Sequence, residues 1–150
     1  MKDSLKQKIW HYLSEVLAKP NPKLGKYPIC PYINKYKQQI AVVKNDNPEV
    51  VVDNFAHVGH IFELEAVVVY GFEWEHEAGM NKVRSLNKEY AKKDVECLFM
   101  DTHMTDFPLP AEYEWNECQL LIIQRHSTLS KSRKELEKGS YYSYFNDSTK

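Results

Sequence analysis

The chain has 150 residues, of which 20 are basic and 21 acidic, and its formal net charge is −1. Hydrophobic residues make up 43% of it, so a disordered chain is excluded and the length predicts one domain over 1–150. The balanced charge excludes the basic footprint of a general nucleic-acid binder, and the longest apolar run, 66–70, is too short for a membrane span.

Helix and strand patterns alternate along the chain. Apolar residues at helical spacing predict a first helix over 3–18, which must end at Pro20. Asn47 followed by Pro48 predicts the start of a second helix, and a third is expected over 76–94. A last helix should start at Ser127 or Thr128. The predicted strands are the apolar runs 39–43, 65–72, 95–101 and 118–124.

This order predicts an α+β domain. We expect a four-stranded mixed sheet packed against helices, ferredoxin-like in character, with an extra N-terminal helix. Right-handed crossovers would set the first three strands parallel, whereas the fourth could run either way. Residues 140–150 are expected to form a loose tail.

A proline-rich segment over 19–38 separates the first helix from the first strand. A connection of this length is typically functional or disordered, and its apolar residues favour an ordered loop. Within it, Cys30 lies between Pro28 and Pro31, which would hold the backbone rigidly enough to present a thiolate nucleophile. The alternative is that Cys30 is a small buried hydrophobic residue.

Three stretches resemble a group of small bacterial domains of unknown function. That group shares a proline-rich loop with a Cys-Pro-aromatic motif, a strand ending in Phe-His-Pro, and a late strand that runs into an Arg-rich turn. The corresponding stretches here are NPKLGKYPICPY, CLFMDTHMTDFP and CQLLIIQRHSTL. The second has Met104 where the group has proline. The resemblance implies a shared fold and site location but no established activity.

The predicted site combines Cys30 with His103, which follows a strand at the end where open α/β sheets bind ligands. The imidazole could act as a general base oriented by Asp101, or it could be an exposed loop histidine. Tyr32 would add an aromatic wall to the same site. We therefore predict Cys30 and His103 as catalytic residues.

Arg125 and His126 end the last predicted strand. They would join His103 only if that strand runs parallel to its neighbour. A guanidinium there suits a carboxylate or phosphate group, and the following helix start could add N–H donors for an anion. A surface arginine and an ordinary helix cap are the alternatives.

Metal binding has one candidate motif. His57 and His60 would lie on one side of a helix, but a metal would need a third ligand such as Glu63, His76 or His103. No recognised metal signature is present, so we predict no metal site and no cofactor.

These patterns predict a small domain with a small-molecule site near the proline-rich segment. An enzyme using Cys30 and His103, of unassigned reaction, is one form of this prediction. Two alternatives stay open: a binding protein for a small anionic ligand, and a protein-interaction module, which includes a homo-oligomer. The cysteines, at unrelated spacings, predict no disulfide framework, and no secretory leader is recognised, so a cytoplasmic location is expected.

Overall fold

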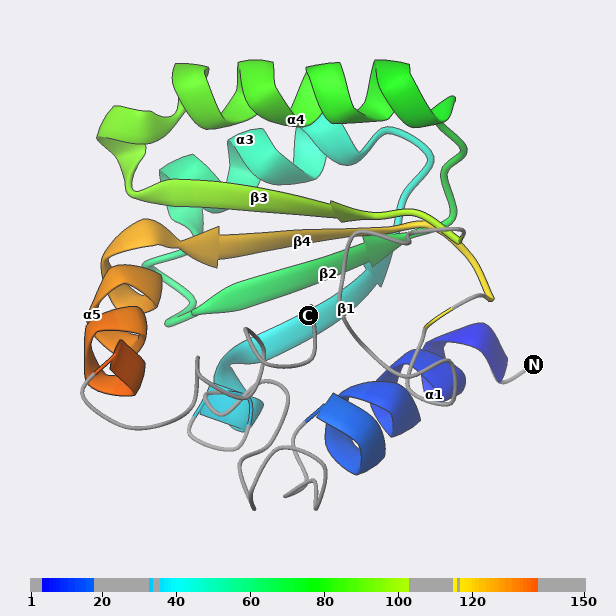
Figure 1. Ribbon diagram of the computed structural model, residues 1–150, viewed down its shortest axis with the longest axis horizontal. Coiled ribbons are helices and arrows are strands. Elements are labelled where there is room, and N and C mark those ends of the chain that lie inside the picture. Colours follow the sequence, from blue (N-terminus) through cyan, green and yellow to red (C-terminus); the bar gives the residue numbers. More distant parts are fainter. Residues whose placement is uncertain (1–3, 18–32, 34–35, 103–114, 116, 138–150) are drawn as a thin grey trace, which may run out of the picture.

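The computed structural model describes residues 4–17, 33, 36–102, 115 and 117–137 (Figure 1). The elements in these ranges are α1 (Ser4–His11), the π-helix η1 (Tyr12–Leu17), η3 (Lys37–Gln39), β1 (Ile40–Lys44), α3 (Pro48–Val58), β2 (Ala66–Tyr70), α4 (His76–Glu89), η4 (Ala91–Lys93), β3 (Val95–Met100), β4 (Leu120–Arg125) and α5 (His126–Glu137).

The four strands form one mixed sheet in the order β1-β2-β4-β3. β1 and β2 pair in parallel, whereas β4 lies antiparallel to both of its neighbours, β2 and β3. The first three strands therefore point the same way, and the fourth returns between two of them. This sheet with its helices confirms the predicted α+β class. The ferredoxin-like detail is not confirmed, because the strands and longer helices after α1 run βαβαββα and not βαββαβ.

Helices α3 and α4 lie on the same side of the sheet (Figure 1). Both connections step in the same direction across the sheet, and right-handed crossovers then place both helices on one face. The apolar residues of this face are buried in one cluster with Val52, Phe55, Val83 and Leu86 of the two helices. A second cluster on the other face includes Ile9, Tyr12 and Leu13 of α1 and η1. Burial on both faces explains why β2 is apolar throughout.

The local sequence explains most element boundaries. Helix α3 begins at Pro48 as predicted, and of its three consecutive valines Val52 is fully buried while Val50 is 47% exposed. The first predicted helix is divided, because an α-helix to His11 continues as a π-helix. Of the described helices, none combines the length and apolar character that crossing a membrane requires.

Helix α4 packs closely on the edge strand β3. A Cβ atom at Gly79 would lie 2.5 Å from Cε2 of Phe99, so only glycine allows this approach. Further along the helix, the Asn87 side chain donates to the Cys97 carbonyl oxygen at 3.1 Å and accepts from the Cys97 amide at 2.6 Å. The side-chain amide of Asn87 therefore makes, at Cys97, the two backbone hydrogen bonds that a further strand beside β3 would otherwise make.

Candidate functional site

The carboxyl ends of β1, β2 and β3 lie at one edge of the sheet, where β4 begins. β2 continues through Gly71, whose φ of 89° suits glycine, and a short segment leads to α4. β3 continues into Asp101 and Thr102. In open α/β sheets this is the edge at which ligands bind.

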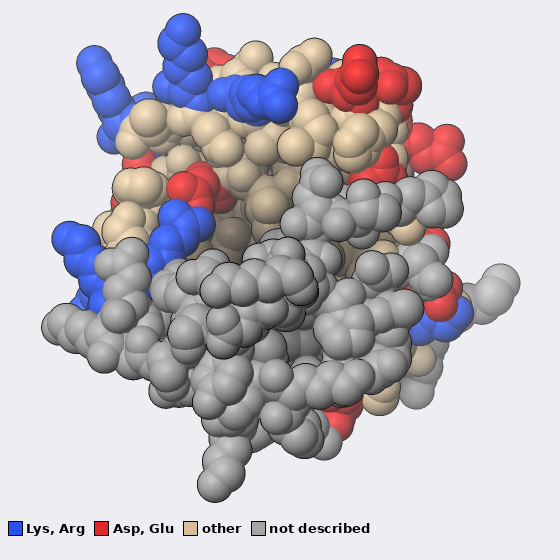
Figure 2. Space-filling view, viewed as in Figure 1, with Lys and Arg blue, Asp and Glu red and all other residues tan. Residues whose placement is uncertain are grey.

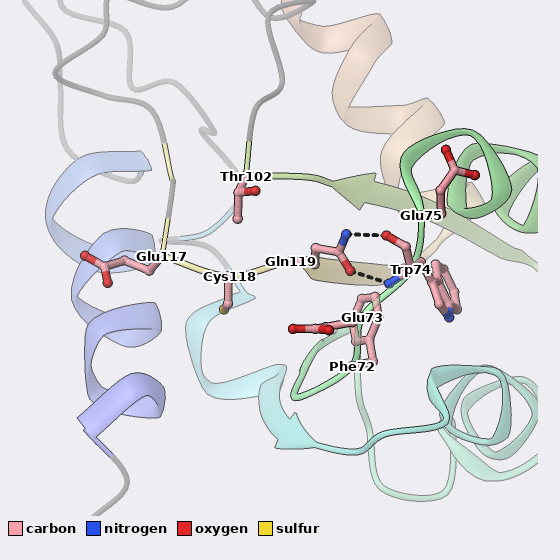
Figure 3. A pocket seen from close by; sticks show the side chains of 8 residues that line it. All are labelled: Phe72, Glu73, Trp74, Glu75, Thr102, Glu117, Cys118 and Gln119. Carbon is pink, nitrogen blue, oxygen red and sulfur yellow. Dashed lines mark hydrogen bonds between the residues drawn. The ribbon is translucent and has the colours of Figure 1, made fainter.

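A hollow of about 590 Å³, the edge hollow, lies here (Figure 3). Its described lining residues are Phe72, Glu73, Trp74, Glu75, Thr102, Glu117, Cys118 and Gln119. Three of them are glutamates and none is basic, so the described wall is acidic. In Figure 3 the Glu73 carboxylate extends toward the side where Glu117 and Cys118 lie, while the Trp74 indole points away.

The acidic character extends beyond the edge hollow. Figure 2 shows acidic side chains gathered where α4 begins and basic side chains farther along that helix. This distribution complements the helix dipole. The Glu75 carboxylate also accepts from the amides of Glu77 and Ala78, so the first turn of α4 already has an anionic cap.

Gln119 connects the two strand ends at the edge hollow. Its Oε1 accepts from the Trp74 amide at 2.7 Å, and its Nε2 donates to the Trp74 carbonyl oxygen at 2.6 Å (Figure 3). The same Nε2 donates to Asp101 Oδ1 at 3.2 Å. These bonds fix the orientation of the amide, because each of its groups has a partner of the correct kind. The sequence offered one signal for this residue, a lone polar side chain at the start of an apolar strand.

Asp101 is the centre of this network. Its side chain is 12% exposed and accepts from Gln119, from the Thr102 amide at 2.7 Å and from His76 Nδ1 at 3.0 Å. Burial opposes ionisation and is the largest single influence on this carboxyl, but the hydrogen bonds from His76, Gln119 and Thr102 together outweigh it. The pKa of Asp101 therefore lies below its ordinary 3.8.

Among the described residues, His76 is the histidine that Asp101 contacts. The sequence suggested His76 only as a third metal ligand, and we expected Asp101 to orient His103. Ligands bind beyond the carboxyl ends of strands in such sheets. Both residues could have been selected on that ground, because His76 follows β2 and Asp101 follows β3.

The remaining predicted residues divide into two groups. Cys30, Tyr32 and His103 lie outside the described residues, although His103 directly follows Thr102 in the chain. Arg125 and His126 are described, and Arg125 pairs with Val95 at the start of β3. The antiparallel direction of β4 therefore places both at the opposite end of the sheet from Asp101.

Arg125 is held in packing contacts. Its guanidinium carbon lies 4.0 Å from the centre of the Phe55 ring, and its Nε donates to the Leu64 carbonyl oxygen at 3.4 Å. Its Nη2 is buried and forms no hydrogen bond with the described residues. The start of α5 beside it is already capped, because Asp94 accepts from the Ser127 amide at 2.6 Å and from its hydroxyl at 2.7 Å.

The two described thiols are poor nucleophiles. Burial raises the pKa of Cys97 to about 12, and burial likewise raises the pKa of the half-buried Cys118. A thiol reacts as its thiolate, so both are largely inert at neutral pH. Neither is a competitor for the role predicted for Cys30.

The described part of the chain holds no group of three histidine, cysteine or acidic side chains that could bind a metal. His57 Nδ1 instead contacts the backbone oxygen of Asp53 at 2.8 Å.

Comparisons with protein-family models, with curated proteins and with solved structures found no match to this chain. The resemblance to small bacterial domains therefore stays a prediction, and the arguments about function rest on the residues of the site.

Proposed function

We propose that the protein binds a small molecule in the edge hollow and that Cys30 and His103 are the reacting groups of an enzyme whose reaction is unassigned. The observation that carries the binding proposal is the fixed polar wall of the edge hollow. Five hydrogen bonds hold the lining residue Gln119 and the adjoining Asp101 in place. Two join Gln119 to the Trp74 backbone, one joins Gln119 to Asp101, and two join Thr102 to Asp101. Such a prearranged wall reduces the entropy lost when a ligand binds.

The charge of the wall favours one class of ligand. Glu73, Glu75 and Glu117 line the edge hollow without a basic residue among the described lining. One of the three glutamates, Glu117, is paired with a base, because Lys8 Nζ lies 3.4 Å from its Oε2. We therefore favour a ligand that carries hydrogen-bond donors or positive charge over the anionic alternative, for which Arg125 lies at the wrong end of the sheet.

A thermal-shift screen of amines, amino acids, nucleosides and sugars tests the proposal. A binding compound should raise the melting temperature of the wild-type protein, and Glu73→Gln should reduce that rise. Glu135→Gln is the matched control, because Glu135 is exposed on α5, outside the edge hollow. The proposal fails if no compound stabilises the protein, or if the two variants respond alike.

One observation favours the interaction module as a second candidate. Val58 at the end of α3 is 39% exposed, and Ile61 and Phe62 just beyond it are 65% and 68% exposed. Contiguous exposed apolar residues mark contact surfaces in many proteins. If this tip joins copies of the chain, sedimentation velocity should show a dimer that Phe62→Ser converts to a monomer. A monomer for both proteins would remove self-association through this tip.

A further inference from the structure

The contact between His76 and Asp101 differs from the other pairs of a histidine with an acid in the described chain. Asp101 is 12% exposed and lies 3.0 Å from Nδ1 of His76, whose own side chain is 51% exposed. The carboxylates beside His57 and His126 are 56% and 26% exposed, and both lie 3.4 Å from their imidazole. Among the described histidines, only His76 therefore combines a half-exposed ring with a buried and fixed carboxylate.

The hydrogen bonds determine which nitrogen of His76 carries the proton. An ionised carboxylate only accepts, so Nδ1 must donate to Asp101 Oδ2. In the neutral imidazole, Nε2 then carries a lone pair and no proton. Nε2 makes no hydrogen bond in the described structure, and the ring is half exposed.

The support for Asp101 is continuous with the edge hollow. Its Oδ1 accepts from Gln119 and Thr102, which both line the hollow. Gln119 is in turn held by the backbone of Trp74. The carboxylate therefore cannot turn away from His76 without breaking several hydrogen bonds.

We propose that His76 is a further proton acceptor of this site, in addition to the proposed His103, and that Asp101 is the positioning residue that fixes the tautomer of His76. This inference rests on the proposed function. The ligand would present an O–H or S–H group, or a bound water, to Nε2. The O–H or S–H bond breaks, its electron pair stays on the oxygen or sulfur, and a new N–H bond forms on Nε2. The resulting imidazolium is stabilised by the Asp101 carboxylate.

The variant Asp101→Asn gives a sharp test. The oxygen of the new amide is needed at the Oδ1 position, where Gln119 and Thr102 donate. Its NH₂ group must then face His76 and donate to Nδ1, which moves the imidazole proton to Nε2. Nitrogen NMR of histidine-labelled protein should show the proton of His76 on Nδ1 in the wild type and on Nε2 in the variant. His57, with Asp53→Asn, is the control. Its proton should stay on Nδ1 in both proteins, because that nitrogen faces the Asp53 backbone oxygen at 2.8 Å.

Chemical modification tests the availability of the base. Diethyl pyrocarbonate at pH 8 should modify His76 at Nε2. Peptide mass spectrometry over time measures the rate of this modification. Asp101→Asn should slow this reaction at least about tenfold, because both nitrogens are then occupied. Asp53→Asn should leave the rate at His57 within about twofold, since that histidine is not fixed by a buried acid.

The outcomes separate the two proposals. An unchanged tautomer in Asp101→Asn, or modification of His76 at the same rate in both proteins, would overturn the role of the pair. A compound that raises the melting temperature should also protect His76 from the reagent, and stabilisation without protection would overturn the assignment of His76 to the site. If the tautomer is as expected but no compound stabilises the protein, the binding proposal is the one that fails.

Discussion

Replacing Gln119 by glutamate should destabilise the fold much more than the same change at an exposed position. In the wild type, Nε2 lies 2.6 Å from the Trp74 carbonyl oxygen and 3.2 Å from Asp101 Oδ1. A carboxylate oxygen at that place would face two acceptors. Both hydrogen bonds would be lost, and two negative charges would meet.

The size of the effect follows from these distances. Each lost hydrogen bond removes about 1 kcal/mol from the free energy of unfolding. Two charges 3.2 Å apart repel by about 5 kcal/mol at an effective dielectric constant of about 20. Proton uptake limits this repulsion, because protonating a glutamate of ordinary pKa at pH 7 costs about 3.7 kcal/mol. For this partly buried site we expect a total loss of about 3–5 kcal/mol.

Urea denaturation at pH 7 and pH 4.5 measures the loss. The introduced carboxyl would have a raised pKa in the folded state, so its penalty applies above the unfolded pKa and shrinks as the pH falls toward it. The loss should decrease to about 1–2 kcal/mol at pH 4.5, where the protonated group can donate again. Gln38→Glu is the control, since Gln38 is exposed in η3 and should shift stability by less than about 0.5 kcal/mol. A loss that does not change with pH, or that equals the control, would refute the reasoning.

Three further predictions concern stability, acid sensitivity and thiol reactivity. Asn87→Ala should lower the free energy of unfolding by about 2–3 kcal/mol, because it removes the side chain that pairs with the Cys97 amide and carbonyl. A loss under about 0.5 kcal/mol, measured by urea denaturation, would contradict this. The lowered pKa of Asp101 stabilises the protein above the unfolded pKa, and this contribution is lost as the pH falls through the folded value. Asp101→Ala should therefore flatten the dependence of stability on pH below about pH 4, and an unchanged acid limb would count against the network. Iodoacetamide at neutral pH should leave Cys97 unmodified and label Cys118 slowly. Peptide mass spectrometry should therefore find a reactive Cys30 labelled first. Earliest labelling at Cys118 would contradict the argument that burial suppresses its reactivity.

Matched controls are available for the first and last of these predictions. Asn81→Ala removes an exposed amide whose one hydrogen bond to a described residue comes from the exposed Arg84 side chain. It should change the free energy of unfolding by less than about 0.5 kcal/mol. Full denaturation in urea should make all cysteines react alike, which would show that the folded environment causes the differences.

Periodicity predicted the elements because apolar spacing is a local property. The helix at Pro48 and the central strand 66–70 could be identified from their own residues. The insertion of β4 between β2 and β3 could not, since the place of a strand in a sheet depends on packing between distant segments. The direction of β4, which the sequence left open, decides at which end of the sheet Arg125 lies.

The position of Asp101 in the fold was predictable, but its partners were not. Asp101 lies at the expected edge because it follows a strand, and this needs no knowledge of other elements. Its contacts with His76 and Gln119 join residues 25 and 18 positions away in the chain. A periodic sequence pattern does not predict such contacts, because they depend on the orientation of single side chains.

The amide of Asn87 has a consequence for assembly. The side chain of α4 occupies the outward-facing amide and carbonyl of Cys97 in the middle of β3. A strand from another molecule would have to displace this side chain before it could pair there. The fold thereby protects one of the two outer strands of its sheet against edge-to-edge association.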